Sequence, residues 1–267
     1  MIMGFERALF NRTRLLLGDD SMDRIHSAKV IIFGVGGVGS WCAEALVRTG
    51  ISHLTIVDSD RVCITNVNRQ LMADTTTIGM VKVEALKNRL LAINPAAKID
   101  ARQEIFCEGN VEDFHLEDYD YIIDAIDSLK DKAALILAAS RTRAKFFSSM
   151  GAALKIDPTK IEVAEFWKVK GCPLARALRQ KFKRSKKFPA KTFKCVFSDE
   201  LLENHGKETA CGSDKCLCPK SKDVDGNPEL ANHEWCSSKA QINGSLMHIT
   251  AMFGMTLAGL VIQDIVG

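Results

Sequence analysis

Apolar runs of strand length alternate with segments of helical spacing over the first half of the chain. The predicted strands are Val30–Phe33, Leu54–Val57, Lys98–Ala101, Tyr121–Ala125 and Phe146–Met150. Between them apolar side chains recur every three or four residues, and the predicted helices are Val38–Thr49, Val81–Ile93 and Leu129–Arg141. Strands that alternate with helices form right-handed β–α–β units, whose parallel sheet is covered on both faces. The pattern predicts an α/β fold with a Rossmann-like, doubly wound, mostly parallel sheet.

The pattern changes after Met150. Two later strands, Ile161–Phe166 and Phe193–Phe197, extend the predicted sheet, and a basic helix lies between them at Leu174–Lys183. A polar, cysteine-containing stretch (198–240) then precedes a last apolar helix, Leu246–Val266. A polar loop of that length is usually functional or disordered. We expect one domain over residues 1–267, made of an N-terminal arm (1–28), a core of alternating strands and helices (29–150) and a second half (151–267), in which the loop at about 198–240 is mobile.

No segment has the pattern of a secreted or membrane-spanning chain. The N-terminus lacks the uninterrupted apolar stretch of a signal peptide, and the nine cysteines do not form a secreted framework. The apolar part of the last helix, Leu246–Ile262, has 17 residues, fewer than the ~20 that a bilayer span needs. We therefore expect a cytoplasmic protein whose last helix is buried or faces a dimer partner, and we rank membrane association below this interpretation.

The basic residues gather in one segment, although the net charge is small. Lys and Arg number 36 and Asp and Glu 33, which gives a formal charge of +3. Between Glu165 and Asp199 there are 11 Lys and Arg and no acid, a pattern typical of contact with a polyanion. The alternative is a solvated helix face. The candidate phosphate-binding residues are Arg176, Arg179, Lys183, Arg184 and Lys187, and the aromatic residues near them are Phe182, Phe188 and Phe193.

A glycine-rich loop follows the first predicted strand and opens the first predicted helix. Its glycines are Gly34, Gly36, Gly37 and Gly39. In this context the first glycine permits a tight turn, the second lets the backbone approach a phosphate, and the third lets the helix pack on the strand. Asp58 ends the second strand, 24 residues after Gly34, where a carboxylate accepts hydrogen bonds from a ribose. The loop predicts a nucleotide site, and both NAD and ATP fit it.

Polar residues beyond Asp58 favour ATP. Asp60, Asn66 and Gln70 lie in this segment, and two cations close to it, Arg69 and Lys82, are suited to neutralise the charge that develops during attack on the α-phosphate. Asp127 follows the fourth strand and is placed to hold Mg²⁺ on phosphate oxygens. The alternative is that the cations are solvated and that Asp127 caps the next helix.

These motifs in this order resemble the ubiquitin-activating-enzyme-like adenylyltransferases, the ThiF/MoeB/HesA superfamily. The resemblance runs from about Arg12 to Met150 and rests on GVGGVG, Asp58, Asn66 with Arg69-Gln70, Gly79-Met80-Val81-Lys82, and Asp124-Ala-Ile-Asp127-Ser128. It implies adenylation of a carboxylate with ATP and Mg²⁺ within a homodimer. It also implies that an N-terminal arginine enters the partner subunit's site; Arg12, in Phe10-Asn11-Arg12-Thr13, is the candidate.

The second half resembles one branch of this superfamily, the tRNA threonylcarbamoyladenosine dehydratases. The similar segments are Met150–Ala153, Ile156–Thr159, Cys172–Arg176 and Cys195–Ser198. This resemblance implies activation of the threonine carboxylate of the modified adenosine in tRNA, followed by ring closure and net loss of water. Two alternatives stay open: adenylation of the C-terminal glycine of a ubiquitin-like sulfur carrier, and an NAD-dependent oxidoreductase. A third is a tRNA-binding module without catalysis.

The cysteines leave their chemistry open. Members that activate sulfur carriers commonly hold zinc through two CxxC pairs, which this chain lacks. Four irregularly spaced cysteines lie in the late polar segment: Cys211, Cys216, Cys218 and Cys236. Three interpretations stay open for them: zinc ligands, reactive thiols, or free cysteines without a chemical role. If they are reactive thiols, a sulfur-transfer protein is the expected partner. Cys195 lies near basic residues, which we expect to lower its pKa, so a sulfur-accepting role is one interpretation; we favour the other, a buried structural cysteine.

Overall fold

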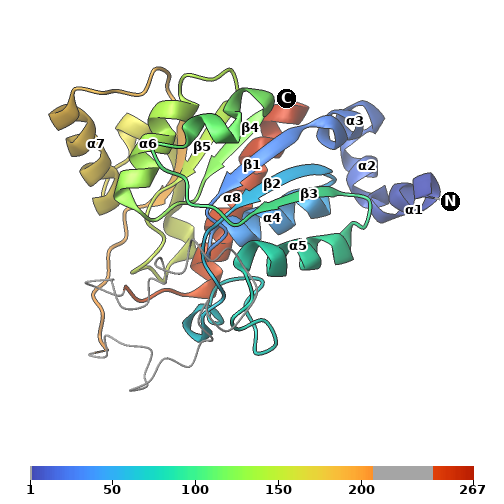
Figure 1. The fold of residues 1–267 in the computed structure, drawn as a ribbon, viewed down its shortest axis with the longest axis horizontal. Coiled ribbons are helices and arrows are strands. Elements are labelled where there is room, and N and C mark those ends of the chain that lie inside the picture. The colour runs from blue at the N-terminus through green and yellow to red at the C-terminus, as the bar shows by residue number, and fades with distance from the viewer. Residues whose placement is uncertain (1, 207–242) are drawn as a thin grey trace.

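The computed structural model describes residues 2–206 and 243–267 and has one sheet between two layers of helices (Figure 1). Its strands are β1 (Lys29–Phe33), β2 (His53–Val57), β3 (Lys98–Arg102), β4 (Tyr121–Asp124), β5 (Lys145–Ser149), β6 (Ile161–Glu165) and β7 (Lys194–Ser198). Its α-helices are α1 (Ile2–Leu9), α2 (Asn11–Leu17), α3 (Asp19–Ser27), α4 (Gly39–Thr49), α5 (Lys82–Ile93), α6 (Leu129–Ala139), α7 (Pro173–Ser185) and α8 (Met247–Val266).

The seven strands lie in the order β3-β2-β1-β4-β5-β7-β6. Every neighbouring pair is parallel except β6 and β7, which are antiparallel. The predicted doubly wound, mostly parallel sheet extended by later strands is confirmed. What the sequence pattern did not predict is the direction of β6, which returns along the outer edge of β7.

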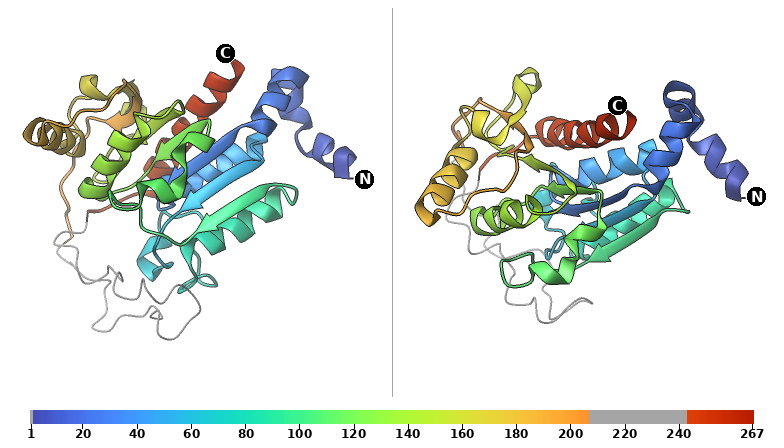
Figure 2. Two further views of the ribbon diagram at one scale, coloured as in Figure 1. Left: turned by 45° about the horizontal axis from the view of Figure 1, so that its top comes forward. Right: turned by 90° about the horizontal axis from the view of Figure 1, so that it is seen from above.

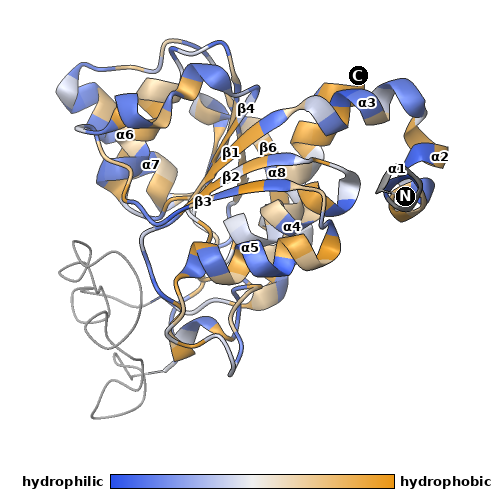
Figure 3. Ribbon diagram, turned by 45° about the vertical axis from the view of Figure 1, so that its right-hand side comes forward, coloured by the Kyte–Doolittle hydropathy of each residue, from blue (hydrophilic) through white to orange (hydrophobic). Residues whose placement is uncertain are grey.

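Successive side chains of β1 point into different halves of the core. Val30 and Ile32 pack with the apolar faces of α4, α5 and α8, whereas Ile31 and Phe33 pack with those of α6 and α7. Because side chains alternate across a strand, a central strand with helices on both faces is apolar throughout. Figure 3 shows these strands as a hydrophobic band between helices whose outer sides are polar.

The last helix is part of the core. α8 packs along α4 and also touches α3 and β5. A Cβ at Gly254 would overlap the carbonyl oxygen of Val38, so the two helices meet at backbone distance. α8 is long and apolar enough to cross a membrane, and 56% of its most apolar window is buried against the rest of the protein. That burial is the pattern of a core helix, which passes the same test of length and composition.

The N-terminal arm projects from the end of the sheet where the parallel strands begin. α3 leads directly into β1, and α1 and α2 extend away from it (Figures 1 and 2). Leu15 and Leu16 on α2 are 77% and 82% exposed. The glycine loop lies at the other end of β1, so the arm and the loop are at opposite ends of the sheet.

Candidate active site

The glycine loop closes tightly onto the loop after β4. Gly34 has φ +84°, a left-handed conformation that favours glycine, and its N–H donates to the Val57 carbonyl at 2.8 Å. A Cβ at Gly34 would lie 2.7 Å from the Ala125 carbonyl oxygen, and one at Gly39 would overlap the carbonyl oxygen of Gly34. Packing therefore requires glycine at positions 34 and 39. Gly36 and Gly37, in the middle of the loop, are the glycines that a ligand can approach.

The middle of the loop presents backbone N–H groups at the start of α4. The N–H groups of Gly36 and Gly37 donate to no acceptor among residues 2–206 and 243–267. The Ser40 hydroxyl donates to the Gly36 carbonyl at 2.6 Å and accepts the Leu71 N–H at 3.2 Å, which ties the loop to the segment after Gln70. Unpaired N–H groups and the positive end of a helix dipole suit this turn to bind an anion.

Asp58 braces the loop from the end of β2. One of its carboxylate oxygens accepts the Val35 N–H at 2.8 Å, and the other accepts the Asp60 N–H at 2.9 Å. A carboxylate has about four lone-pair directions, so two further acceptor positions remain for ribose hydroxyls. Asp58 therefore both shapes the loop and keeps the capacity that the sequence predicted for it.

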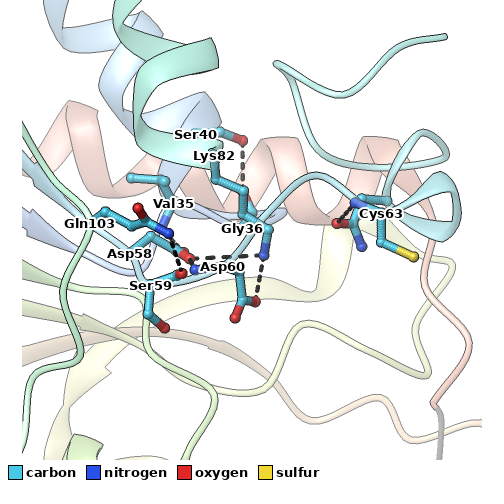
Figure 4. Close-up of polar contacts among 10 residues, drawn as sticks. Val35, Gly36, Ser40, Asp58, Ser59, Asp60, Cys63, Lys82 and Gln103 are labelled. Carbon is cyan, nitrogen blue, oxygen red and sulfur yellow. Dashed lines mark hydrogen bonds and ion pairs between the residues drawn. The ribbon is translucent and has the colours of Figure 1, made fainter. Parts of the chain in front are cut away.

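Lys82, the first residue of α5, lies beside these acids and is 5% exposed. Its Nζ lies 2.7 Å from an oxygen of Asp60 and 3.9 Å from an oxygen of Asp58 (Figure 4). Burial alone would lower the pKa of Lys82, but the two carboxylates outweigh burial and raise it. Lys82 is thus a fixed, charged ammonium group, and its burial is a feature that its sequence position did not reveal.

A short turn, η1 (Ile64–Asn66), and the residues after it present Arg69 to the glycine loop. Arg69 Nη1 donates to the Thr65 carbonyl and to Asn68 Oδ1, both at 2.9 Å, and its Cγ lies 3.4 Å from the Cβ position of Gly37. Burial lowers the pKa of Arg69, and the nearby carboxylate of Asp127 opposes this shift. The aliphatic part of Arg69 therefore packs on the turn that offers N–H groups to an anion, while Thr65 and Asn68 fix its guanidinium group.

Two amides that the sequence singled out have different surroundings. Asn66 is buried and its Oδ1 accepts the Cys63 N–H at 3.0 Å, so it braces η1. Gln70 is also buried, and its Oε1 has no hydrogen-bond partner among the described residues. Asn68, which the sequence did not indicate, joins Arg69 to the segment before α8 through a 3.0 Å bond from its Nδ2 to the Ser245 carbonyl.

The loop that carries Asp127 is fixed by a buried ion pair that the sequence did not predict. Lys132 and Asp124 are fully buried and lie 2.8 Å apart. Asp124 accepts the Ile126 N–H at 3.1 Å, and Lys132 donates to the Ile126 carbonyl at 3.0 Å. Both backbone groups of the residue before Asp127 are thereby held. Asp127 itself is exposed and interacts electrostatically with Arg69 and Lys82.

The structure brings most of the candidate residues together at the carboxyl end of β1, β2 and β4. This group, connected by the contacts above, comprises Gly34, Gly36, Gly37, Gly39, Asp58, Asp60, Asn66, Arg69, Gln70, Lys82 and Asp127. Arg12 is not part of it within one chain, because it is exposed on α2 at the other end of the sheet. The four thiols Cys211, Cys216, Cys218 and Cys236 lie outside the described residues. Within the described residues, no three His, Cys, Asp or Glu side chains form a metal cluster.

The basic segment divides into exposed and internal side chains. Arg176, Lys183 and Arg184 are exposed on α7. Arg179 instead donates to the carbonyls of Phe166 and Val169, both at 3.0 Å, and so holds α7 to the turn before it. Lys187 pairs with Glu108 at 3.1 Å on the surface.

The phenylalanines and the cysteines of that segment are buried, except Phe188. Phe182 and Phe193 are buried, and Phe188 is exposed. Cys195 is fully buried, and burial raises its pKa well above the usual value. The expectation that basic neighbours lower this pKa was wrong, because desolvation of the thiolate outweighs the nearby Lys132.

Comparison with known proteins identifies relatives over nearly the whole chain. The tRNA threonylcarbamoyladenosine dehydratase of Escherichia coli is 35% identical over 253 residues, which cover 93% of this chain and 90% of that protein. The Bacillus subtilis protein of the same name is 37% identical, with 80% of this chain and 84% of that protein covered. The crystal structure of the E. coli enzyme TcdA in complex with ATP superposes with a TM-score of 0.79 at 32% identity, covering 97% of this chain and 94% of that one. The model of the ThiF family matches residues 10–267, and the chain therefore belongs to the ThiF family.

Proposed function

We propose that this protein is an ATP-dependent tRNA-modifying enzyme, a tRNA threonylcarbamoyladenosine dehydratase. It would adenylate the carboxylate of threonylcarbamoyladenosine in tRNA and close the side chain into a ring with net loss of water. The observation that carries the proposal is a glycine loop with unpaired N–H groups that has Arg69 beside Gly37 and Lys82 beside Asp58, the carboxylate that braces the loop. The similarity to dehydratases over nearly the full length of both chains supports this substrate over others of the family.

The glycine loop is the proposed site of the ATP phosphates. The N–H groups of Gly36 and Gly37 would donate to phosphate oxygens, and Asp58 would accept hydrogen bonds from the ribose. Asp127 carries the oxygen ligands that Mg²⁺ prefers and would hold the ion beside the ATP phosphates. The ion would supply further neutralisation of phosphate charge.

The reaction needs positioning and charge stabilisation more than a protein nucleophile. A carboxylate oxygen of the substrate attacks the α-phosphorus, a P–O bond forms, and the bond to the leaving pyrophosphate breaks. Arg69 and Lys82 stabilise the negative charge that gathers on the phosphate oxygens in this step. The carbamoyl group of the same substrate then attacks the activated carbonyl carbon, loses a proton and displaces AMP, so that one water is lost overall.

The site would be completed by a second copy of the chain. Arg12 is exposed on an arm far from the glycine loop of its own subunit, and in a homodimer it would reach the loop of the partner. α8 and the residue before it leave Leu246, Met252 and Met255 exposed at 41–47%, which provides an apolar face for such a dimer.

The remaining parts of the proposal concern the tRNA and the surroundings of the enzyme. Arg176, Lys183 and Arg184 would contact tRNA phosphates, whereas Arg179 would support α7 from within. We place the enzyme in the cytoplasm as a single adenylation domain. Bound zinc and a sulfur-transfer partner stay predictions, because the cysteines concerned lie outside the described residues.

One incubation tests the proposal. Purified protein is mixed with ATP, Mg²⁺ and tRNA that carries threonylcarbamoyladenosine, and the digested nucleosides are analysed by mass spectrometry. We expect that nucleoside to lose the mass of one water, and pyrophosphate exchange to be stimulated by the tRNA. Exchange stimulated by a ubiquitin-like sulfur carrier and not by tRNA would contradict the proposal, as would binding of NAD in place of ATP in calorimetry.

A further inference from the structure

Two large aromatic side chains lie exposed beside each other next to α7. Trp167, in the turn η5 (Phe166–Lys168), is 40% exposed, and Phe188, just after α7, is 51% exposed. Their ring centroids are 6.2 Å apart. Trp167 also packs edge-to-face on buried Phe166 at 5.2 Å, and its backbone N–H donates to Glu165 Oε2 at 3.1 Å. The aromatic pair Trp167–Phe188 is therefore anchored from below and open to a ligand from outside.

The surroundings of the aromatic pair are positively charged. Lys168, Lys170 and Lys186 are exposed next to it in the chain, and the segment from 166 to 198 holds no acid. Of the nearby acids, Glu165 accepts the Trp167 N–H, Glu108 is paired with Lys187, and Glu162 and Asp199 line the same hollow as Lys168 and Lys170. The 11 cations between Glu165 and Asp199 outnumber these four acids, so the field around the pair attracts polyanions.

The aromatic pair is remote from the glycine loop. β6 runs opposite to the other strands, and its last residue, Glu165, pairs with Lys194 at the start of β7. The pair therefore lies near the beginning of the parallel strands, about 17 Å along the strand direction from their carboxyl ends and about four strand spacings from β1, or about 19 Å, across the sheet. A nucleotide at the glycine loop cannot touch both places, but a tRNA is large enough to do so.

We propose that Trp167 and Phe188 form a stacking platform for an unpaired nucleobase of the tRNA, at a second contact away from the reacting nucleotide. This inference rests on the proposed function. Every base has a flat π-face that stacks on aromatic rings, and specific RNA binding mainly uses unpaired bases of this kind. The lysines around the pair contact the phosphates on either side of that base. Of Phe182, Phe188 and Phe193, only Phe188 is exposed, and the second exposed ring of the pair, Trp167, lies before the basic helix.

Binding of tRNA as a function of salt concentration tests the platform. The full-length protein is compared with Trp167→Ala, Trp167→Leu, Trp167→Phe and Phe188→Ala by filter binding. We expect both alanine variants to weaken tRNA binding by roughly 5- to 100-fold, with an unchanged slope of log affinity against log salt, because these variants keep every lysine that binds a phosphate. The Trp167→Phe variant should recover most of the affinity and the Trp167→Leu variant should not, since only the former keeps a ring.

Control variants separate stacking from charge and from misfolding. Replacing Lys168, Lys170 and Lys186 by Gln should weaken binding and also reduce the salt slope, by about one for each phosphate that no longer has a lysine beside it. Leu201→Ala removes an apolar side chain that is 55% exposed and lies outside the proposed site and dimer face, and it should leave tRNA affinity unchanged. All variants should bind ATP and unfold like the wild type.

The test separates this inference from the function on which it rests. Wild-type affinity in Trp167→Ala, or full affinity in Trp167→Leu, would overturn the platform while dehydration by the wild type still supports the function. If Trp167→Ala instead loses a protein partner and keeps its tRNA affinity, the pair is a protein contact and the inference is equally overturned. Failure of the wild-type protein to bind tRNA at all would refute the proposed function itself.

Discussion

Removal of the buried ammonium group of Lys132 is the sharpest perturbation that the structure offers. Lys132 is fully buried on α6, 2.8 Å from the equally buried carboxylate of Asp124. That carboxylate also accepts the Ser148 hydroxyl at 2.6 Å and the Ile126 N–H at 3.1 Å. In Lys132→Met the side chain keeps a similar length and loses its charge, so Asp124 is left as a buried anion with two neutral donors.

The expected loss of stability is large. Breaking a buried ion pair by removing one partner costs about 3–5 kcal/mol, because the remaining charge is uncompensated. A domain is stabilised by about 5–15 kcal/mol in total. In the double variant Asp124→Asn/Lys132→Met, the amide oxygen still accepts from Ser148 or Ile126 and no charge is left. The double variant should therefore regain most of the loss, with about 1–3 kcal/mol remaining for the unpaired Ile126 carbonyl.

Urea unfolding followed by circular dichroism measures both values. The three proteins are compared at one protein concentration, because the proposed dimerisation would make the apparent stability depend on it. The functional counterpart is measured well below the unfolding transition: the released loop carries Asp127, so Lys132→Met should lose pyrophosphate exchange while folded. A loss below about 1 kcal/mol in the single variant, or a double variant as unstable as the single one, would refute the assignment of the pair as an essential brace.

Three further predictions concern the loop, the phosphate cation and a histidine in the sheet. Arg69→Ala should reduce pyrophosphate exchange by about 10²–10³-fold, while the exposed Arg48→Ala serves as a control and should not; equal rates in wild type and Arg69→Ala would contradict the proposed role. Gly39→Ala should destabilise the protein by about 1–3 kcal/mol in urea unfolding and weaken ATP binding in calorimetry, because the new Cβ would overlap the carbonyl oxygen of Gly34. Burial and the lysines that pair with His53 on both flanking strands lower the pKa of His53 in the folded state. The unfolded chain therefore binds more protons between that pKa and about 6.5, and the free energy of unfolding should fall as the pH is lowered through this window. A His53→Gln variant with the same pH dependence would show that another group is responsible.

The sequence predicted the parts of the fold and the site that depend on local patterns. Apolar runs and helical spacing placed the strands, and the helices after β1, to within a few residues, whereas α1, α2 and α3 in the N-terminal arm were not predicted. The glycine loop with Asp58 was recognisable because its spacing reflects one turn between a strand and a helix. The direction of β6 was not predictable, because pairing of edge strands depends on which surface is left uncovered.

The missed features are contacts between distant segments. Lys132 lies in the first turn of α6, where a lysine normally faces solvent, and only the position of β4 shows that it is buried against Asp124. In the sequence Arg179 does not differ from its exposed neighbours in the basic segment, but its guanidinium group donates a hydrogen bond to the Phe166 carbonyl. Trp167 lies outside the basic helix, and no spacing rule brings it next to Phe188.

The packing of α8 against the glycine loop has a consequence for biosynthesis. Gly37 lies against Thr250, and Gly254 meets the carbonyl of Val38, so segments more than two hundred positions apart in the chain meet at the glycine loop. Contacts of such long sequence separation form late and slow the folding of a domain. The emerging polypeptide would therefore expose the face of α4 that α8 covers until the last helix leaves the ribosome, and until then that apolar face would be accessible to chaperones.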